Sequence, residues 1–212
     1  DAGVINEAAP GEVLSPVTSF IPTSSEGYVQ VTFVVDTNRY RGRTTVAFED
    51  LYHDGRLIMT HADINDQAQT MEIPLIHTNA YGYDVMGDVV AYSDRASVTD
   101  QVYYENLLVG RTYTVQGSLY WMYTDDNGNV HSGPVSSLLG DLQGMSTAVF
   151  TAESTDGVID LQFVFDSTVL AGLRYDKLVV METLYLNGVS ICSHWDLNDE
   201  AQTVYGQIAA QD

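Results

Sequence analysis

The stretch KLVVMETLYL, residues 177–186, decides the fold class. It is a run of aliphatic, β-branched and aromatic residues, which is typical of a buried strand. The following LNGV, residues 186–189, carries the Asn-Gly pair that favours a tight hairpin turn. Glu182 interrupts the apolar run with a carboxylate. Its spacing from Val180 and Leu184 predicts a side chain that faces the core, and an outward-facing glutamate on a half-exposed strand is the alternative.

Similar strand patterns recur along the chain, with no long helical pattern between them. They are YVQVTFVVD, TTVAFEDLYH, TYTVQGSLYWMYT and IDLQFVFD, at residues 28–36, 44–53, 112–124 and 159–166. The turn signals HDGR, LVGRT and DDNGN lie between them. Strands at this spacing without intervening helices predict an all-β fold made of Ig-like antiparallel β-sandwich modules in tandem.

The composition of the chain of 212 residues argues against several partners and cofactors. Eight Lys and Arg against 29 Asp and Glu give a formal net charge of −21. A surface this acidic repels nucleic acid, and we expect no membrane insertion either. Cys192 is the only cysteine, so no intrachain disulfide can form. The His and Cys residues show no zinc spacing, and TDDNGN at 124–129 favours a hairpin turn over a calcium loop. We therefore predict no metal and no cofactor.

An internal repeat organises the chain. HADINDQAQT at 61–70 nearly matches HWDLNDEAQT at 194–203, and the similarity extends back through strands and turn glycines to Phe20 and Phe150. Only the second copy is preceded by further strand-like sequence. We therefore expect residues 1–73 to be the C-terminal half of a first module, with its N-terminal strands missing, and residues 74–212 to be a complete module. Half a sandwich leaves strand edges unpaired, so either another polypeptide completes it or the sequence is a piece of a longer one.

Five polar residues with potential chemistry lie on separate segments of the second block. They are Thr78 in PLIHTNAYGYD, Asp100 in VTDQVYYENL, Glu182 in VVMETLY, and His194 and Gln202 in HWDLNDEAQT. A carboxylate that faces the core needs a hydrogen-bond partner and has a raised pKa. These segments are therefore the candidates for a reactive site.

Four motifs together resemble the VaFE-repeat domains, also called Thr–Gln ester-bond domains, of Gram-positive cell-surface adhesins. The motifs are IHTNA at 76–80, DQVYYENLLVGRTYTVQG at 100–117, VAFEDLY at 46–52 with its counterpart VVMETLY at 179–185, and the two copies that end in Gln-Thr. The resemblance covers almost the whole chain. It implies an Ig-like sandwich that forms a covalent bond within itself.

The resemblance also implies a role for each residue. The Thr78 hydroxyl would attack the side-chain amide of Gln202, so that ammonia leaves and an ester remains. His194 would accept the threonine proton, because a hydroxyl is a weak nucleophile without a base. Glu182 and Asp100 would share a proton and polarise the amide. The reaction occurs once in each molecule, so we expect self-modification and no enzyme.

Some positions leave alternatives open. The family often has two consecutive threonines where this chain has Thr78-Asn79, and Met181 replaces a phenylalanine. His77 is a rival base, although its strand parity places it on the opposite face from Thr78. Three nearby carboxylates are alternatives to Asp100, namely Asp84, Asp88 and Asp94.

The first block carries equivalents of only part of this site. Glu49, His61 and Gln69 match residues of the second block, but no equivalent of the threonine or the aspartate precedes them. We predict that this block cannot form its own ester. A chain that supplies the missing strands and a threonine could complete it and become attached to Gln69.

The expected function is that of a structural stalk domain in an extracellular, cell-wall-anchored adhesin. An ester between the first and last strands would resist unfolding by force and proteolysis. The alternative is an Ig-like module that binds a host-surface protein or glycan, with Tyr120, Trp121 and Tyr123 as its surface. Neighbouring modules of the same chain are the other expected partners. A Lys–Asn isopeptide through Lys177 and a hydrolase with turnover are the weaker alternatives.

Overall fold

The computed structural model describes residues 16–82, 87–140, 142–170 and 177–206. The chain forms two compact units, Asp1–Tyr40 and Arg41–Asp212. The described part of the first unit has no regular secondary structure before a short helix, α1 (Thr37–Tyr40). The strand predicted at 28–36 is wrong, because these residues join no ladder in the described structure. A strand needs a neighbour for its backbone hydrogen bonds, and alternating sequence alone does not supply one.

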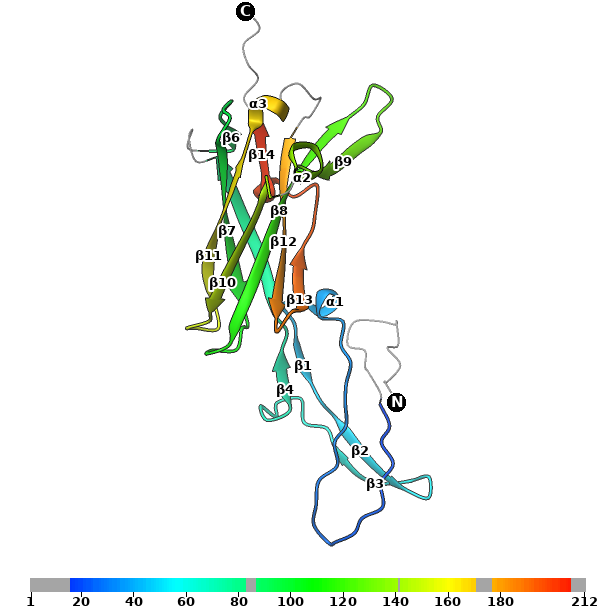
Figure 1. The fold of residues 1–212 in the computed structure, drawn as a ribbon. Coiled ribbons are helices and arrows are strands. Elements are labelled where there is room, and N and C mark those ends of the chain that lie inside the picture. The colour runs from blue at the N-terminus through cyan, green and yellow to red at the C-terminus, as the bar shows by residue number, and fades with distance from the viewer. Residues whose placement is uncertain (1–15, 83–86, 141, 171–176, 207–212) are drawn as a thin grey trace, which may run out of the picture. The chain divides into compact units, whose positions relative to one another are not determined.

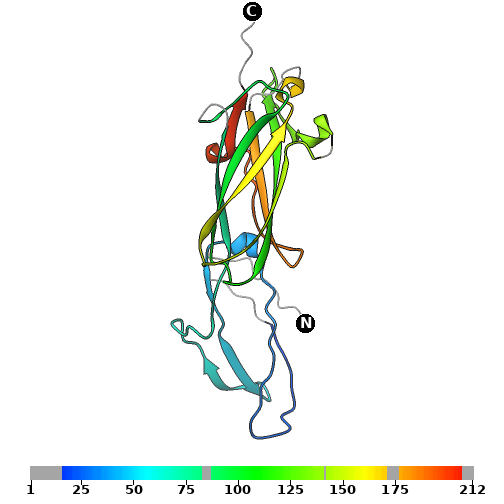
Figure 2. The same cartoon turned by 60° about the vertical axis from the view of Figure 1, so that its left-hand side comes forward.

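Most of the second unit is a sandwich of two sheets (Figures 1 and 2). The smaller sheet has the order β11–β7–β5, formed by β5 (Leu75–Gly82), β7 (Ala96–Glu105) and β11 (Gly157–Phe165). The larger sheet has the order β10–β8–β12–β14–β6. Its strands are β6 (Val89–Val90), β8 (Thr112–Thr124), β10 (Met145–Thr151), β12 (Lys177–Leu186) and β14 (Thr203–Gly206). The all-β fold class predicted from the sequence is confirmed.

Two further strands extend the larger sheet. β13 (Val189–His194) pairs with β12, and β9 (Val130–Pro134) pairs with β8. The ladders of both sheets are antiparallel except for β14–β6, which is parallel. The short helices are α2 (Ser136–Leu139), α3 (Ser167–Leu170) and the 3-10 turn η1 (Glu200–Gln202).

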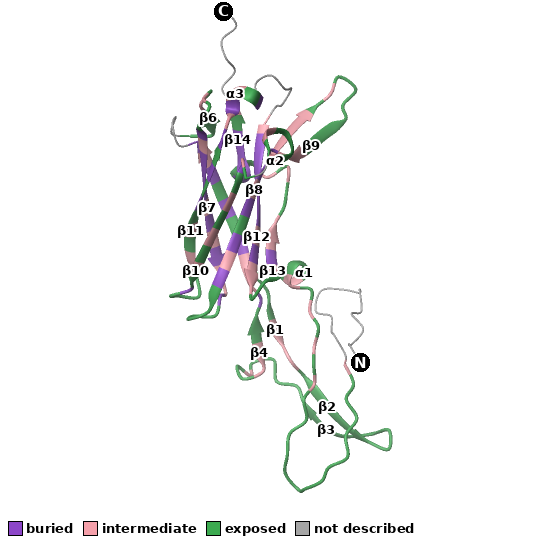
Figure 3. Ribbon diagram, in the orientation of Figure 1, coloured by how far each residue is buried: buried purple, intermediate pink, exposed green. Residues whose placement is uncertain are grey.

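The core lies between the two sheets, where side chains alternate between buried and exposed positions along each strand. Figure 3 shows buried positions concentrated on β7, β8, β12 and β14. The largest apolar side chains that are fully buried include Tyr113, Phe163, Phe165, Leu119 and Leu178. The same interior also holds polar residues, which is unusual unless they have a role.

The remaining strands form two small two-stranded sheets. β1 (Thr44–Val46) pairs with β4 (Thr70–Glu72), and β2 (Glu49–His53) pairs with β3 (Arg56–His61). Within the described residues each of these strands has a single neighbour, and most of their residues are exposed (Figure 3). No helix in the described part of the chain is both long and apolar enough to cross a membrane.

Candidate functional site

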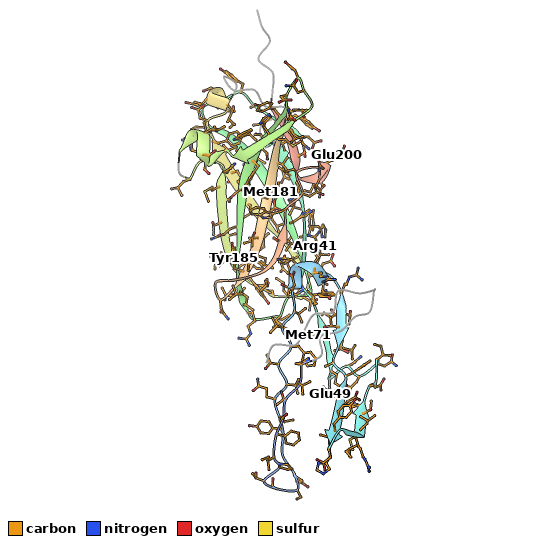
Figure 4. All side chains as sticks on the ribbon, turned by 90° about the vertical axis from the view of Figure 1, so that its right-hand side faces the viewer. Arg41, Glu49, Met71, Met181, Tyr185 and Glu200 are labelled. Carbon is orange, nitrogen blue, oxygen red and sulfur yellow. The ribbon has the colours of Figure 1, made fainter. Side chains whose placement is uncertain are left out.

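The turn η1 presents Gln202 to the interior of the sandwich. Asp199 precedes the turn, and its Oδ1 accepts a hydrogen bond from the Ala201 amide at 2.8 Å. The Thr203 hydroxyl donates to the Asp199 carbonyl at 2.7 Å and closes the turn. Glu200, labelled in Figure 4, marks the start of this turn. The geometry leaves Gln202 fully buried at 0% exposure, where an amide needs partners inside the protein.

Glu182 on β12 is the principal partner of this amide. It lies opposite His194 in the β12–β13 ladder and is fully buried, so the inward-facing orientation is the one that the structure shows. The Gln202 Nε2 donates to Glu182 Oε2 at 2.7 Å and to the His194 carbonyl at 3.3 Å. The Gln202 carbonyl oxygen Oε1 has no hydrogen-bond partner. The amide is therefore held by its nitrogen, and the oxygen where charge would develop is free.

Thr78 and Asp100 come from the opposite sheet. Thr78 lies on β5, which contacts both η1 and β14, and Asp100 lies opposite Ala80 in the β5–β7 ladder. Both residues are buried, and neither the Thr78 hydroxyl nor the Asp100 carboxyl makes a hydrogen bond of good geometry. The Asp100 carboxyl still lies close enough to Thr78 and Glu182 for both to influence its pKa. The two sheets thus bring a hydroxyl, an amide and two carboxyls together in a dry interior.

His194 carries a second interaction that orients its ring. Its Nε2 lies 3.0 Å from Asp199 Oδ2, while its Nδ1 is buried without a hydrogen-bond partner. A carboxylate beside Nε2 favours the tautomer with the proton on Nε2, which leaves Nδ1 as a proton acceptor. Asp199 was not among the residues predicted for the site. Its signal was present in the repeat, since an aspartate follows the histidine by five residues in both HADIND and HWDLND.

Burial raises the pKa values of Asp100 and Glu182 and lowers that of His194. Desolvation raises the pKa of Asp100 to about 7, against the opposing effects of Glu182 and Thr78. Desolvation and then the nearby Asp100 charge raise the pKa of Glu182 well above its usual range. Two close buried carboxyls cannot both ionise, so the pair retains a proton near neutral pH. Burial lowers the pKa of His194, although Asp199 acts against the shift, so the imidazole is neutral at pH 7.

The rival residues lie elsewhere. The side chain of His77 is 51% exposed, stacks on Tyr103 with ring centroids 5.0 Å apart, and lies 3.8 Å from Glu105. Asp88 and Asp94 are exposed. Asp84, the third alternative, falls outside the described residues. No group of three His, Cys, Asp or Glu side chains among the described residues is arranged to hold a metal ion.

The aromatic residues proposed as a ligand-binding surface are half-buried. Tyr120, Trp121 and Tyr123 each lie at intermediate exposure on β8. Trp121 packs against the core and stacks on Tyr123 at 6.0 Å between ring centroids. Lys177 begins β12 at intermediate exposure. Packing against the core accounts for Trp121, and a ligand-binding role for this hairpin stays a prediction.

The predicted residues of the first block lie together on β2, β3 and the turn before β4. Gln69 Nε2 donates a hydrogen bond to Glu49 Oε2, and His61 Nε2 lies 3.2 Å from Asp66 Oδ2. These contacts repeat those of Gln202, Glu182, His194 and Asp199. They differ in exposure, because the side chains of Glu49 and His61 are 43% and 55% exposed.

The profile of the T-Q ester bond containing domain matches residues 2–73 and again residues 74–206. The chain belongs to this family. It therefore carries two matches to the T-Q domain, and the five residues described above lie within the second. Comparison with curated protein sequences gave no match.

Several solved structures resemble part of this T-Q chain. A bacterial adhesin from Mobiluncus mulieris, described as containing intramolecular disulfide, isopeptide and ester bond cross-links, is 17% identical, with 64% of this chain and 58% of that chain covered and a TM-score of 0.42. A second crystal form of that adhesin gives 18% identity and a TM-score of 0.43 over the same shares. An immunoglobulin-like protein from Pseudomonas aeruginosa is 8% identical, with 63% of this chain and 92% of that chain covered and a TM-score of 0.27. The chain spans 58% of the length of the adhesin structure that it matches.

Proposed function

We propose that residues 74–206 form an intramolecular ester between Thr78 Oγ1 and the side-chain carbonyl carbon of Gln202, and that the chain is a stalk segment of an extracellular adhesin. The observation that supports this is the convergence of buried groups whose reactive atoms have no hydrogen-bond partner: Thr78 Oγ1, His194 Nδ1, Gln202 Oε1 and the Asp100 carboxyl. Buried polar atoms are normally satisfied, so a cluster of unsatisfied ones needs an explanation. A reaction among them supplies it.

In the first step, His194 acts as the base for Thr78. Its neutral Nδ1 takes the hydroxyl proton while Oγ1 attacks the amide carbon of Gln202. The Asp199 carboxylate, 3.0 Å from Nε2, orients the ring and stabilises the imidazolium that forms. Asp199 is thus a positioning residue for the base.

Asp100 and Glu182 act on the electrophile, the side-chain amide of Gln202. Negative charge develops on Gln202 Oε1, and a proton held between Asp100 and Glu182 can be donated to it as the tetrahedral intermediate forms. That proton returns to the carboxyl pair when the carbonyl re-forms. Glu182 Oε2 already accepts a hydrogen bond from the amide nitrogen, which must leave. When the C–N bond breaks, the proton taken from Thr78 passes from His194 to the nitrogen, and ammonia is released. The products are one ester and one ammonia.

The arrangement supports a single reaction in each molecule. Nucleophile and electrophile are parts of one chain, and the fold holds them together, which corresponds to an effective molarity on the order of 10⁵ M or more. Burial also keeps water away from the ester once it has formed. We therefore assign the chain no enzymatic turnover on an added substrate.

The ester would join β5, the first strand of the sandwich, to the turn η1 that precedes its last strand, β14. Like a disulfide across a loop of this length, it would contribute about 4–5 kcal/mol by restricting the unfolded chain. It would also prevent β5 from peeling away from β14 under tension. Such a cross-link suits an extracellular surface protein whose single cysteine cannot provide a disulfide.

The test is the intact mass of the purified chain, followed by peptide mapping. We expect a deficit of one ammonia, localised to a peptide pair that contains Thr78 and Gln202. The variant Thr78→Ala should restore the full mass. Thr99→Ala is the matched control, because Thr99 is equally buried with an unpartnered hydroxyl but lies outside the proposed reaction. An unmodified wild-type mass would overturn the proposal and make the ligand-binding module the leading alternative.

A further inference from the structure

A hollow of about 400 Å³ lies on the outer face of the smaller sheet, where β5 and β11 begin and β7 ends. We call it the outer pocket. Its volume lies within the range of small-ligand sites, about 300–1,000 Å³. All three strands of the sheet and the turn before β11 contribute to its lining, which includes His77, Tyr103, Glu105, Asp156, Gly157 and Val158.

The outer pocket is separate from the site of the proposed ester. Thr78 on β5 and Asp100 on β7 are buried toward the core, and successive side chains of a strand point to opposite faces. His77 pairs with Tyr103 in the β5–β7 ladder, and Tyr103 pairs with Val158 in the β11–β7 ladder. These three side chains therefore form one row across the face that points away from the ester.

The start of β11 offers bare backbone to the pocket. Gly157 lies opposite Tyr104 in the ladder, and a Cβ at this position would overlap the tyrosine hydroxyl. The Tyr104 ring is anchored in the core, where it stacks on Phe150 with ring centroids 5.2 Å apart. A side chain at position 157 is therefore excluded, and the space beside the backbone stays open.

The aromatic wall of the pocket is held in place by contacts within the sheet. The His77 ring stacks on Tyr103 with centroids 5.0 Å apart and an angle of 6° between the planes. The Tyr103 hydroxyl donates a hydrogen bond to Gln101 Oε1 at 3.1 Å. Val158, which is 46% exposed, adds an aliphatic surface beside Tyr103. A wall that is already ordered loses little conformational freedom when a ligand binds.

Two carboxylates line the same pocket. The Asp156 carboxylate accepts hydrogen bonds from the Asn106 amide and the Thr155 hydroxyl, each at 3.2 Å. Glu105 Oε1 lies 3.8 Å from His77 Nδ1. Among the described residues, neither carboxylate forms an ion pair with a lysine or an arginine. The pocket thus combines an aromatic wall with negative charge, in a chain whose formal net charge is −21.

This combination selects a flat cation. The carboxylates repel an anion, and a neutral ligand makes no use of their charge. An ammonium is compact and strongly hydrated, whereas a guanidinium stacks on aromatic rings and donates two parallel hydrogen bonds to a carboxylate. We propose that the outer pocket binds an arginine side chain of a partner protein, with the guanidinium against the His77–Tyr103 ring pair and hydrogen-bonded to Glu105 or Asp156. This recognition function is additional to the proposed cross-link and does not depend on it.

The experiment titrates the full ¹⁵N-labelled chain with the peptide acetyl-Gly-Arg-Gly-amide and follows the backbone amide shifts by NMR. We expect saturable shifts that cluster at residues 103–106 and 156–158. Replacing arginine by its neutral analogue citrulline should weaken binding about tenfold or more, and replacing it by lysine about fivefold. Free arginine should also bind more weakly than the capped peptide, because the pocket repels its carboxylate.

Two variants and a charge-matched control locate the binding. Glu105→Gln and Tyr103→Leu should each weaken binding of the arginine peptide about five- to tenfold. Asp160→Asn removes the same charge as Glu105→Gln from an exposed position on β11 outside the pocket, and it should leave the affinity unchanged.

Several results would overturn this inference. They are equal affinity for the citrulline or lysine peptide, equal weakening by Asp160→Asn, and shifts that spread over the acidic surface without saturation. Tighter binding of free arginine would overturn the assignment to a partner protein. The ester is measured separately by intact mass, so the failure of either proposal leaves the other standing.

Discussion

Glu182 and Glu49 occupy the same position in two copies of one hairpin, and each accepts a hydrogen bond from the amide of a glutamine twenty residues later. Glu182 is fully buried, whereas the side chain of Glu49 is 43% exposed. In the part of the chain that the structure describes, the hairpin, the turn and the hydrogen bonds are therefore the same in the copy that no second sheet covers. These features depend on contacts within about twenty residues of sequence, which is why they appear in both copies.

The chemical state of the site depends on more distant parts of the chain. The pKa of Glu182 is raised because the sandwich excludes water and because Asp100 arrives from β7 in the other sheet. Desolvation makes a carboxyl retain its proton and strengthens each polar interaction around the amide. The comparison teaches that local sequence arranges the groups of the proposed reaction and that burial shifts their pKa values.

Replacing the glutamate of each copy by glutamine should give the largest difference between the two copies in the rate of ester formation. Glu182→Gln keeps the volume and the fold but removes the proton donor, so ester formation should slow by about 10⁴-fold or more. Glu49→Gln should leave the mass deficit unchanged. Intact mass over time measures both. Formation of the ester at the wild-type rate in Glu182→Gln would show that the carboxyl pair has no part in the reaction.

Replacing the aspartate beside each histidine should give the next largest difference between the two copies in the rate of cross-linking. Asp199→Asn retains an acceptor for the Ala201 amide but loses the charge beside His194, so cross-linking should slow by about 10²–10³-fold. The acid limb of the pH–rate profile should also move to lower pH, since Asp199 raises the pKa of His194. Asp66→Asn is the control and should change neither quantity. A slower reaction with an unmoved profile would mean that Asp199 only supports the turn.

Substitution of the equivalent leucine in each copy tests how much its packing contributes to the free energy of unfolding. In chains that already carry Thr78→Ala, so that no ester forms, Leu184→Ala should lower the free energy of unfolding by about 2–5 kcal/mol. Leu51→Ala, at the equivalent but exposed position, should change it by about 0.5 kcal/mol or less. Denaturant titrations monitored by fluorescence measure both. Equal losses would show that β2 is buried in solution, contrary to the exposure seen here.

Much of this comparison was predictable from sequence. The strand at 177–186 and its hairpin turn follow from local propensity, and the repeat located the second copy of the Glu, His and Gln positions. Thr78 and Asp100 were identified through a family resemblance, because no local pattern links residues that come together only across two sheets. For the same reason, sequence left Asp84, Asp88 and Asp94 open as alternatives to Asp100.

Two features were missed for physical reasons. Residues 28–36 alternate like a strand, but a strand forms only where a partner backbone is available. Asp199 looked like an ordinary acidic residue in a polar segment. Its role depends on the turn of η1, which directs one carboxylate oxygen at a backbone amide and the other at His194.

The pH dependence of cross-linking should show the smallest effect, about tenfold for each pH unit outside an optimum near neutrality. The rate should fall in acid as His194 is protonated, below its usual pKa because burial lowers that value. It should fall in base only above pH 7, because Asp100 ionises near pH 7 while the raised pKa of Glu182 keeps one shared proton on the pair until Glu182 also ionises. In the Thr78→Ala chain, the same raised pKa gives a stability contribution that is present below the ordinary aspartate pKa of 3.8 and is lost as pH rises to about 7. Refolding of unreacted chain at a series of pH values, read by mass, tests the rate, and denaturant titrations of Thr78→Ala test the stability. A rate that increases steadily with pH would show that deprotonation of the nucleophile controls the reaction and that the shared proton does not.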